Sequence, residues 1–143
     1  MDIHFLTKDS DYSAVLDVLL QLRTGYDMET LSAQVDKQLS SGYQVVYVKS
    51  PEGVLAVAGF TVSEKLAWGK SIYIDDLITH SAHRSRGVGQ FIMNWFKNYA
   101  VQIDCDQIHL DSGVQRFAAH RFYLRAGFNI ASHHFSMVGL KNS

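Results

Sequence analysis

The chain has 143 residues, of which 47% are hydrophobic and 19% charged, with a formal net charge of −1. This length predicts one domain over residues 1–143, and the composition excludes a mainly disordered chain. The near-neutral charge argues against a general nucleic-acid-binding protein, and a single cysteine excludes both a disulfide within the chain and a cysteine-based zinc cluster.

The first elements of the chain are a strand and two helices. Polar and apolar residues alternate over residues 2–6, which predicts an edge strand. Apolar residues at helical spacing then predict helices over 12–22 and 31–39. Ser10 or Asp11 is the candidate N-cap of the first of these helices.

The middle of the chain is rich in β-branched and aromatic residues. It predicts strands over 43–48, 54–62 and 70–79, which fit an antiparallel meander. The strongest helical periodicity in the chain follows over 88–99, and a short strand is expected over 107–110.

The last quarter of the chain predicts a helix over 115–125, with Gly127 as the glycine that ends it. Two closing strands are expected over 128–130 and 133–140. The order of elements predicts an α+β fold of the three-layer α/β/α type, with a mixed, mostly antiparallel sheet and helices on both faces.

The turn before the helix over 88–99 carries two arginines and two glycines, in the sequence Arg84-Ser85-Arg86-Gly87-Val88-Gly89. Unpaired N–H groups at a helix N-terminus, with the arginines beside them, suit a phosphate or diphosphate. The turn is neither a Walker A loop nor a full dinucleotide fingerprint. A helix start with solvated arginines, or a loop for another phosphorylated ligand, therefore remains an alternative.

A second motif lies in residues 110–128, and with it the chain resembles the GNAT superfamily of acyl-CoA-dependent N-acetyltransferases. The family's acetyl-CoA loop, Gln/Arg-x-x-Gly-x-Gly/Ala, is matched by Arg84, Gly87 and Gly89. Its later helix, Ala-x-x-Phe-Tyr-x-x-x-Gly-Phe, is matched by Ala119, Phe122, Tyr123, Gly127 and Phe128. Residues 116–125 look more closely like the aminoalkylphosphonate N-acetyltransferase branch.

The resemblance implies acetyl-CoA as co-substrate. Its diphosphate would lie on the loop and helix start formed by Arg84, Ser85, Arg86, Gly87, Val88, Gly89 and Gln90. Its pantetheine arm would pair with the main chain of Leu77, Ile78 and Thr79 like an added strand. Arg116 stands where the family often has Asn, and Ser81 where it often has Pro. The usual side-chain contact to pantetheine is therefore in doubt, although Arg116 could add a charge contact.

The resemblance also implies two proton-transfer roles. A protonated amine must lose a proton before it attacks a thioester, and a carboxylate is a suitable base. We favour Asp76, with Asp75 as the alternative, because neighbouring strand residues face opposite sides and a bulge could exchange them. Tyr123 matches the tyrosine that protonates the departing thiolate; without the family pattern it would be a packed helix aromatic.

These observations predict an acetyl-CoA-dependent N-acetyltransferase acting on the primary amine of a small molecule. The alternatives are a protein or peptide N-acetyltransferase and a non-catalytic acyl-CoA sensor. We expect no metal, no nucleic-acid partner, no membrane partner and a cytoplasmic location, and we leave a homodimer open. The acceptor would lie between the early helices and the sheet, near the mixed-charge set Arg23, Tyr26, Asp27 and Glu29.

Overall fold

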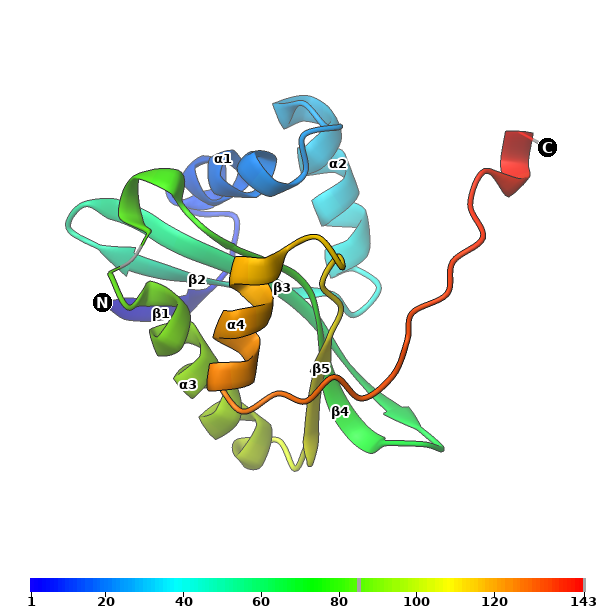
Figure 1. Cartoon of the computed structure of the whole chain (residues 1–143). Helices are drawn as coiled ribbons and strands as arrows, with labels where there is room; N and C mark the ends of the chain where they lie inside the picture. The colour runs from blue at the N-terminus through cyan, green and yellow to red at the C-terminus, as the bar shows by residue number, and fades with distance from the viewer. Residues whose placement is uncertain (85, 143) are drawn as a thin grey trace. The chain divides into compact units, whose positions relative to one another are not determined.

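The β-branched middle of the chain forms an antiparallel meander, and a fifth strand extends it. The computed structural model describes residues 1–84 and 86–142. Its sheet has the order β1-β2-β3-β4-β5, in which all neighbours are antiparallel except the parallel pair β4–β5 (Figure 1). The strands are β1 (Asp2–Phe5), β2 (Gln44–Ser50), β3 (Gly53–Lys65), β4 (Gly69–Thr79) and β5 (Gln107–Leu110).

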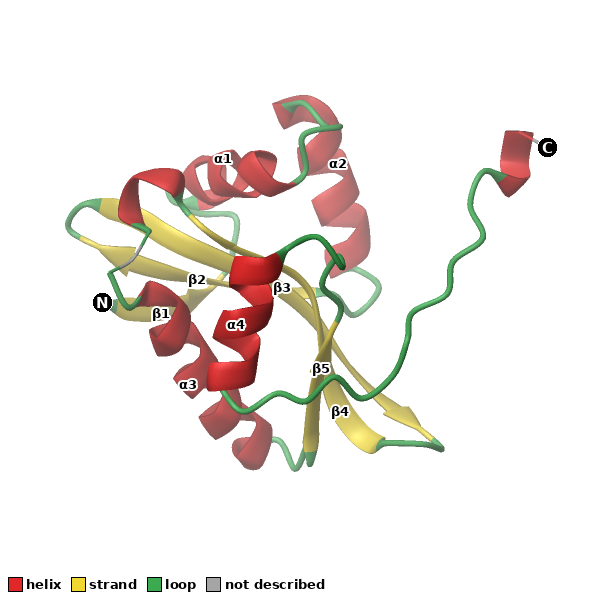
Figure 2. Cartoon of the chain, viewed as in Figure 1, coloured by secondary structure: helices red, strands yellow, loops and turns green. Residues whose placement is uncertain are grey.

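Helices cover both faces of this sheet, as the sequence predicts (Figure 2). One face carries α1 (Tyr12–Leu22) and α2 (Met28–Leu39), and the other carries α3 (Val88–Gln102). The short 3-10 helix η1 (Ser81–His83) precedes α3. The predicted bounds of the helices and of the five strands agree with the structure to within three residues at every end.

Each face has its own apolar core. Leu16 and Leu19 of α1 are buried with Val57 of β3 and Ile78 of β4 on one side. On the other side, Phe60 of β3 meets Phe96 of α3 edge to face, with ring centroids 5.2 Å apart. Edge-to-face aromatic pairs add stability beyond the area they bury.

A β-bulge in β4 changes which face its side chains meet. Gly59 of β3 lies opposite Asp76, and the next residue, Phe60, lies opposite Ile74, so Asp75 has no partner in β3. Residues directly opposite in a ladder share a face. Ile74 therefore faces α3 with Phe60, whereas Asp76 faces the side of α1 and α2.

The chain divides into two compact units, Met1–Leu110 and Asp111–Ser143. The second contains α4 (Phe117–Arg125) and the 3-10 helix η2 (Leu140–Asn142). Gly127 ends α4 with a φ of 105°, as predicted. The N–H groups of Gly127 and Phe128 donate to the carbonyls of Leu124 and Tyr123, which is a Schellman motif.

The prediction of two closing strands over 128–130 and 133–140 is wrong. Among the described residues, no strand forms after α4. Apolar side chains there are exposed, with Phe135 at 92% and Val138 at 85%. Alternating apolar residues favour a strand only where a ladder partner satisfies the backbone, and this segment has none in the described part of the chain.

Asp11 occupies the N-cap position of α1, as predicted, but its side chain makes no capping bond. Its carboxylate instead accepts from Tyr47 Oη at 2.9 Å and Lys49 Nζ at 2.8 Å. These donors hold the pKa of Asp11 below its usual value, and burial beside Asp11 raises the pKa of Tyr47 to about 12. In the described residues, no helix has the length and apolar character to cross a membrane.

Candidate functional site

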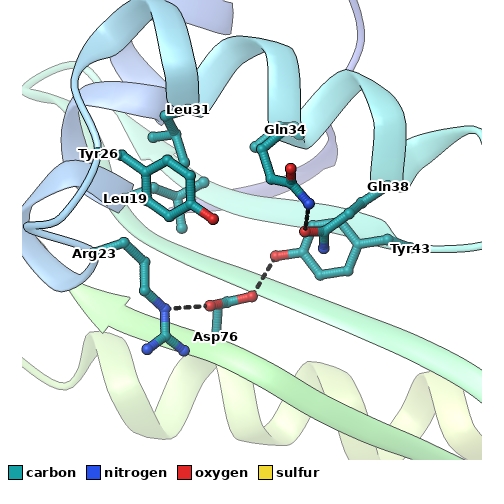
Figure 3. A pocket seen from close by; sticks show the side chains of 9 residues that line it. Leu19, Arg23, Tyr26, Leu31, Gln34, Gln38, Tyr43 and Asp76 are labelled. Carbon is teal, nitrogen blue, oxygen red and sulfur yellow. Dashed lines mark hydrogen bonds and ion pairs between the residues drawn. The ribbon is translucent and has the colours of Figure 1, made fainter. Parts of the chain in front are cut away.

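A cavity of about 300 Å³ opens between the helices α1 and α2 and the sheet. Leu19, Leu31 and Val35 form its apolar wall. The polar part of the lining comes from the loop after α1, from α2, from the residue that precedes β2, and from β4 (Figure 3). It consists of Arg23, Tyr26, Gln34, Gln38, Tyr43 and Asp76.

Asp76 is the carboxylate of this cavity, and two side chains fix its two oxygens. Arg23 Nε donates to Oδ1 at 2.7 Å, and Tyr43 Oη donates to Oδ2 at 2.6 Å (Figure 3). Arg23 Nη2 also donates to the main-chain carbonyl of Asp75 at 3.0 Å. The side chain of Asp76 is only 15% exposed, whereas that of Arg23 is 47% exposed. The carboxylate therefore lies deeper than the guanidinium, which sits at the rim.

Gly59 makes room for the Tyr43 hydroxyl. Its place opposite Asp76 in the ladder puts both residues on the face of α1 and α2. A Cβ at Gly59 would lie 1.6 Å from Tyr43 Oη, well inside van der Waals contact. The absence of a side chain at Gly59 is therefore what allows the phenol of Tyr43, which directly precedes β2, to reach a carboxylate on β4.

Burial and charge act on the ionisable groups around Asp76. Tyr43 is 6% exposed, and burial together with the negative charge of Asp76 raises its pKa well above the usual range. Its hydroxyl therefore stays protonated and donates. The pKa of Asp75 is also raised, first by partial burial of its carboxyl group and then by the charge of Asp76. Asp75 does not line the cavity.

The four residues expected near the acceptor divide into two groups. Arg23 and Tyr26 line the cavity, whereas Asp27 and Glu29 do not. Asp27 is instead the N-cap of α2: its carboxylate accepts from the Thr30 N–H at 2.8 Å in a capping box. This bond holds the pKa of Asp27 below its usual value.

Sequence reasoning missed four residues of the site: Gln34, Gln38, Tyr43 and Gly59. A signal for the first two was present, because they interrupt the apolar stripe that Leu31 and Val35 begin on the same helix face. In the structure, Gln34 Nε2 donates to Gln38 Oε1 at 2.8 Å (Figure 3). Tyr43 and Gly59 depend on strand register, for which no local pattern exists.

The second predicted feature is the N-terminus of α3. Gly87 occupies the N-cap position with a φ of 76°, a left-handed conformation that favours glycine. An added Cβ there would meet no atom within 4 Å, so the space in front of the turn is open. The first bond of the helix runs from Phe91 N–H to the Gly87 carbonyl. Among the described residues, nothing accepts from the N–H groups of Val88, Gly89 and Gln90, as an anion site requires.

The arginines beside this turn have different surroundings. Arg86 makes a two-pronged ion pair with Glu52, at 2.6 and 2.8 Å, and lies 3.0 Å from His83 Nδ1. The pair lowers the pKa of Glu52 and raises that of Arg86. Arg84 is exposed and has no side-chain partner in the described part of the chain. Ser85, which we also expected at this loop, lies outside the described residues.

The third predicted feature is the free edge of β4. β5 pairs with β4 over Ser71–Ile74 and ends opposite Ile74, just before the bulge. Leu77, Ile78 and Thr79 pair with β3 on one side only. In the described part of the first unit, no strand covers their other edge. An extended ligand could therefore add to β4 there through main-chain hydrogen bonds.

Tyr123 and Arg116 belong to the second unit. Tyr123 lies on α4 and meets Phe122 and Phe128 with ring centroids 5.6 and 5.8 Å apart. Partial burial raises the pKa of Tyr123, and the positive charge of Arg116 opposes this shift. Arg116 is the N-cap residue of α4 and makes no capping bond. Within residues 1–84 and 86–142, no group of three His, Cys, Asp or Glu side chains could hold a metal ion.

Comparison with known proteins addresses the family of this chain. Residues 14–128 match the acetyltransferase (GNAT) family. The chain is 30% identical to the uncharacterized N-acetyltransferase YhdJ of Bacillus subtilis (strain 168) over 135 residues, which cover 91% of this chain and 93% of that protein.

Two solved structures show the same fold at low sequence identity. The first is a transcriptional regulator from Bacillus halodurans C-125, with a TM-score of 0.80, 21% identity, and coverage of 96% of this chain and 99% of that one. The second is the aminoglycoside N-acetyltransferase AAC(6')-Iy in complex with CoA, with a TM-score of 0.81, 12% identity, and coverage of 96% and 93%. The chain therefore has the α+β acyl-CoA N-acyltransferase fold, and it belongs to the GNAT family of N-acetyltransferases.

Proposed function

We propose that this enzyme transfers the acetyl group of acetyl-CoA directly to the primary amine of a small molecule. The observation that carries the proposal is the carboxylate of Asp76, fixed by Arg23 and Tyr43 inside a cavity. The free edge of β4 begins at the next residue, Leu77. An amine and a thioester bound at these two places would meet at the bulge of β4.

The N-terminus of α3 and the free edge of β4 are the groups that would hold acetyl-CoA. The open N–H groups of Val88, Gly89 and Gln90, with Arg84 nearby, suit its diphosphate. Its pantetheine arm carries amide groups, which suit the main chain of Leu77–Thr79. When bound, acetyl-CoA would supply the acetyl group as a thioester, and CoA would leave as the thiol.

Asp76 is our candidate base, and Asp75 is the alternative. Asp76 accepts a proton from the bound ammonium, directly or through a water molecule, and so frees the lone pair of the nitrogen. Main-chain N–H groups near Leu77–Thr79 hold the acyl oxygen. Tyr123 donates a proton to the sulfur as the carbon–sulfur bond breaks. The nitrogen loses a second proton to solvent, and exchange with solvent moves the proton of Asp76 to Tyr123, which restores both groups. The products are therefore an amide, a thiol and one released proton.

The size of the cavity supports a small acceptor. Its volume of about 300 Å³ is at the lower end for ligand pockets, which span roughly 300–1,000 Å³. A protein or peptide acceptor would need an extended groove, so its acetylation is the alternative that a test must include. A non-catalytic acyl-CoA sensor is the second alternative.

The first test is thermal unfolding with and without acetyl-CoA, with ATP and NAD as controls. Ligand at about 100 times its Kd should add roughly 2.7 kcal/mol to the free energy of unfolding. We expect a shift with acetyl-CoA and none of similar size with the controls. An equal shift with ATP would indicate a general phosphate loop and would contradict the proposal.

The second test separates an enzyme from a sensor. Tyr123→Phe should lower turnover of amines by roughly 100-fold, which is typical of a lost general acid, while acetyl-CoA still binds. A sensor would show no turnover in the wild-type protein or in the variant. Acetylated lysines or N-termini in a treated lysate, with no small amine acetylated, would favour the protein N-acetyltransferase.

A further inference from the structure

The charged side chains of the cavity form one balanced pair. Among its lining residues, Arg23 and Asp76 are the charged ones, and Arg23 Nε lies 2.7 Å from Asp76 Oδ1. The other polar lining residues are two tyrosines and two glutamines, which are uncharged. A cavity that holds one positive and one negative group favours a ligand with one group of each charge and no net charge.

Both members of the pair keep unused hydrogen-bonding capacity. The guanidinium has five N–H groups, and its bonds to Asp76 and to the Asp75 carbonyl use two of them. The carboxylate has about four acceptor sites, and Arg23 and Tyr43 occupy two. A ligand can therefore bind both groups without breaking the pair.

The position of the two groups gives the ligand a direction. The Asp76 side chain is 15% exposed and the Arg23 side chain 47% exposed, so the negative group is deep and the positive group is at the rim. An amine would enter first and meet Asp76 beside the free edge of β4. An anionic group on the same molecule would stay at the rim, on the forked donors of Arg23, which suit a carboxylate or a phosphonate.

On the basis of the proposed function, we infer that the acceptor is a compact zwitterion: a primary amine whose anionic group, only a few bonds away, is bound by Arg23. Because Arg23 and Asp76 lie next to each other, a ligand that binds both must carry its amine and its anionic group close together. Arg23 is then the residue that determines acceptor specificity. Gln34 and Gln38 add an uncharged wall.

The same arrangement disfavours two other acceptor classes. A polyamine or another polycation needs several carboxylates, and among the lining residues Asp76 is the one carboxylate, already paired with Arg23. A simple alkylamine would leave the three remaining Arg23 N–H groups without an anion. Both should therefore be poorer acceptors than a zwitterion of similar size.

The test uses matched acceptors that differ in charge. Glycine and β-alanine are compared with their amides, aminomethylphosphonate with methylamine, and spermidine serves as the polycation. Release of CoA thiol gives kcat and KM for each. We expect at least one acid-bearing amine to exceed its uncharged partner by about tenfold or more in kcat/KM. The amides have less basic amines, so chemistry alone would favour them.

A variant of Arg23 tests the residue itself. In Arg23→Gln, the ratio of kcat/KM between the acid-bearing acceptor and its uncharged partner should fall to about one. The main cause should be a higher KM for the acid-bearing acceptor. Arg23→Lys should keep part of the preference, because it keeps the charge but loses the fork. Lys97→Gln, which removes an exposed charge on α3, is the matched control and should keep the preference.

The outcomes separate this inference from the proposed function. Equal or better turnover of amides, methylamine or spermidine would overturn the inference and leave the acetyltransferase standing. An acid preference that survives in Arg23→Gln would overturn the role of Arg23. If no amine is acetylated while acetyl-CoA binds, the proposed function fails. In that case, calorimetry measures how tightly each acid-bearing acceptor and its uncharged partner bind to the CoA-loaded protein. Equal affinities within the pairs would overturn the inference.

Discussion

The cavity around Asp76 and the turn before α3 are two kinds of candidate binding site in one unit of the chain. The cavity is built from side chains that are far apart in sequence: Tyr43 and Asp76 are 33 residues apart, and Arg23 and Asp76 are 53 apart. The turn is built from backbone N–H groups of consecutive residues that begin at Gly87. In the proposed function, the side chains of the cavity would select the acceptor, whereas the turn would bind phosphate through its main chain.

The two sites should accordingly fail in different ways. A change in the cavity should affect the acceptor and leave acetyl-CoA binding intact, because Arg23 and Tyr43, which hold the Asp76 carboxylate, do not belong to the turn. A change in the turn should affect acetyl-CoA binding and leave the choice of acceptor intact. Four substitutions test this contrast, beginning with the one of largest expected effect.

Asp76→Asn should lower kcat/KM for the acceptor by roughly 100-fold or more, because an amide cannot accept the ammonium proton. The Kd of acetyl-CoA, measured by calorimetry, should stay within about twofold of wild type. The parallel variant Asp75→Asn should have the smaller effect, since Asp75 does not line the cavity. The reverse order would assign the base to Asp75.

Gly59→Ala should destabilise the fold and damage the cavity together. The new Cβ would overlap Tyr43 Oη, so the ring must move and Asp76 loses a donor. Overpacking of this kind costs roughly 1–3 kcal/mol in a denaturant titration. Gly25→Ala is the matched control, because a Cβ there meets nothing within 4 Å and should change little. Equal stability of the two variants would show that Tyr43 is not held as described.

Gly87→Ala should act on the turn alone. The left-handed φ of 76° costs an L-residue roughly 1–2 kcal/mol, so the turn would be strained or would reshape. Acetyl-CoA should bind about tenfold more weakly, while the ratio of kcat/KM between acid-bearing and uncharged acceptors stays unchanged. A changed ratio would mean that the turn also shapes the acceptor site.

Glu52→Gln should have the smallest effect, an increase of a few-fold in acetyl-CoA affinity, because it releases the Arg86 guanidinium for phosphate. Arg86 holds the pKa of Glu52 below its usual 4.5, so the pair persists above that value and is lost as pH falls through the lower folded pKa. The difference between variant and wild type should therefore be full near about pH 7 and shrink below about pH 4. Glu64→Gln is the exposed control, and weaker binding by Glu52→Gln would contradict the prediction.

The same contrast explains what could be predicted from the sequence. The turn and α3 follow from local spacing, so the helix start at Val88 and the glycine at its N-cap could be located by pattern. β5 was predicted at its observed bounds, 107–110, for the same reason. Asp76 was named because the family resemblance implies a carboxylate there, and Arg23 and Tyr26 because they belong to a mixed-charge set in the loop between the early helices.

Tyr43 and Gly59 could not be predicted, because their contact depends on how β2, β3 and β4 are aligned, and alignment is a property of the whole sheet. Asp27 was expected near the acceptor but does not line the cavity, because its capping pair with Thr30 satisfies its carboxylate locally. The closing strands failed for a related reason. Alternation at residues 133–140 shows which side chains could share a face, but it does not supply a neighbouring strand.

The bulge at Asp75 interrupts the alternation of side chains along β4. Ile72 and Ile74 point to one side of the sheet and Asp76 and Ile78 to the other, although all four have even numbers. Without residue 75, Asp76 would follow Ile74 directly, and regular alternation would leave it opposite Gly59 on the cavity side. Residue 75 therefore adds a local bend to the strand and does not set the direction of the carboxylate. Relatives that share this cavity should accept many residue types at position 75, and a gap there should leave the carboxylate on the same face.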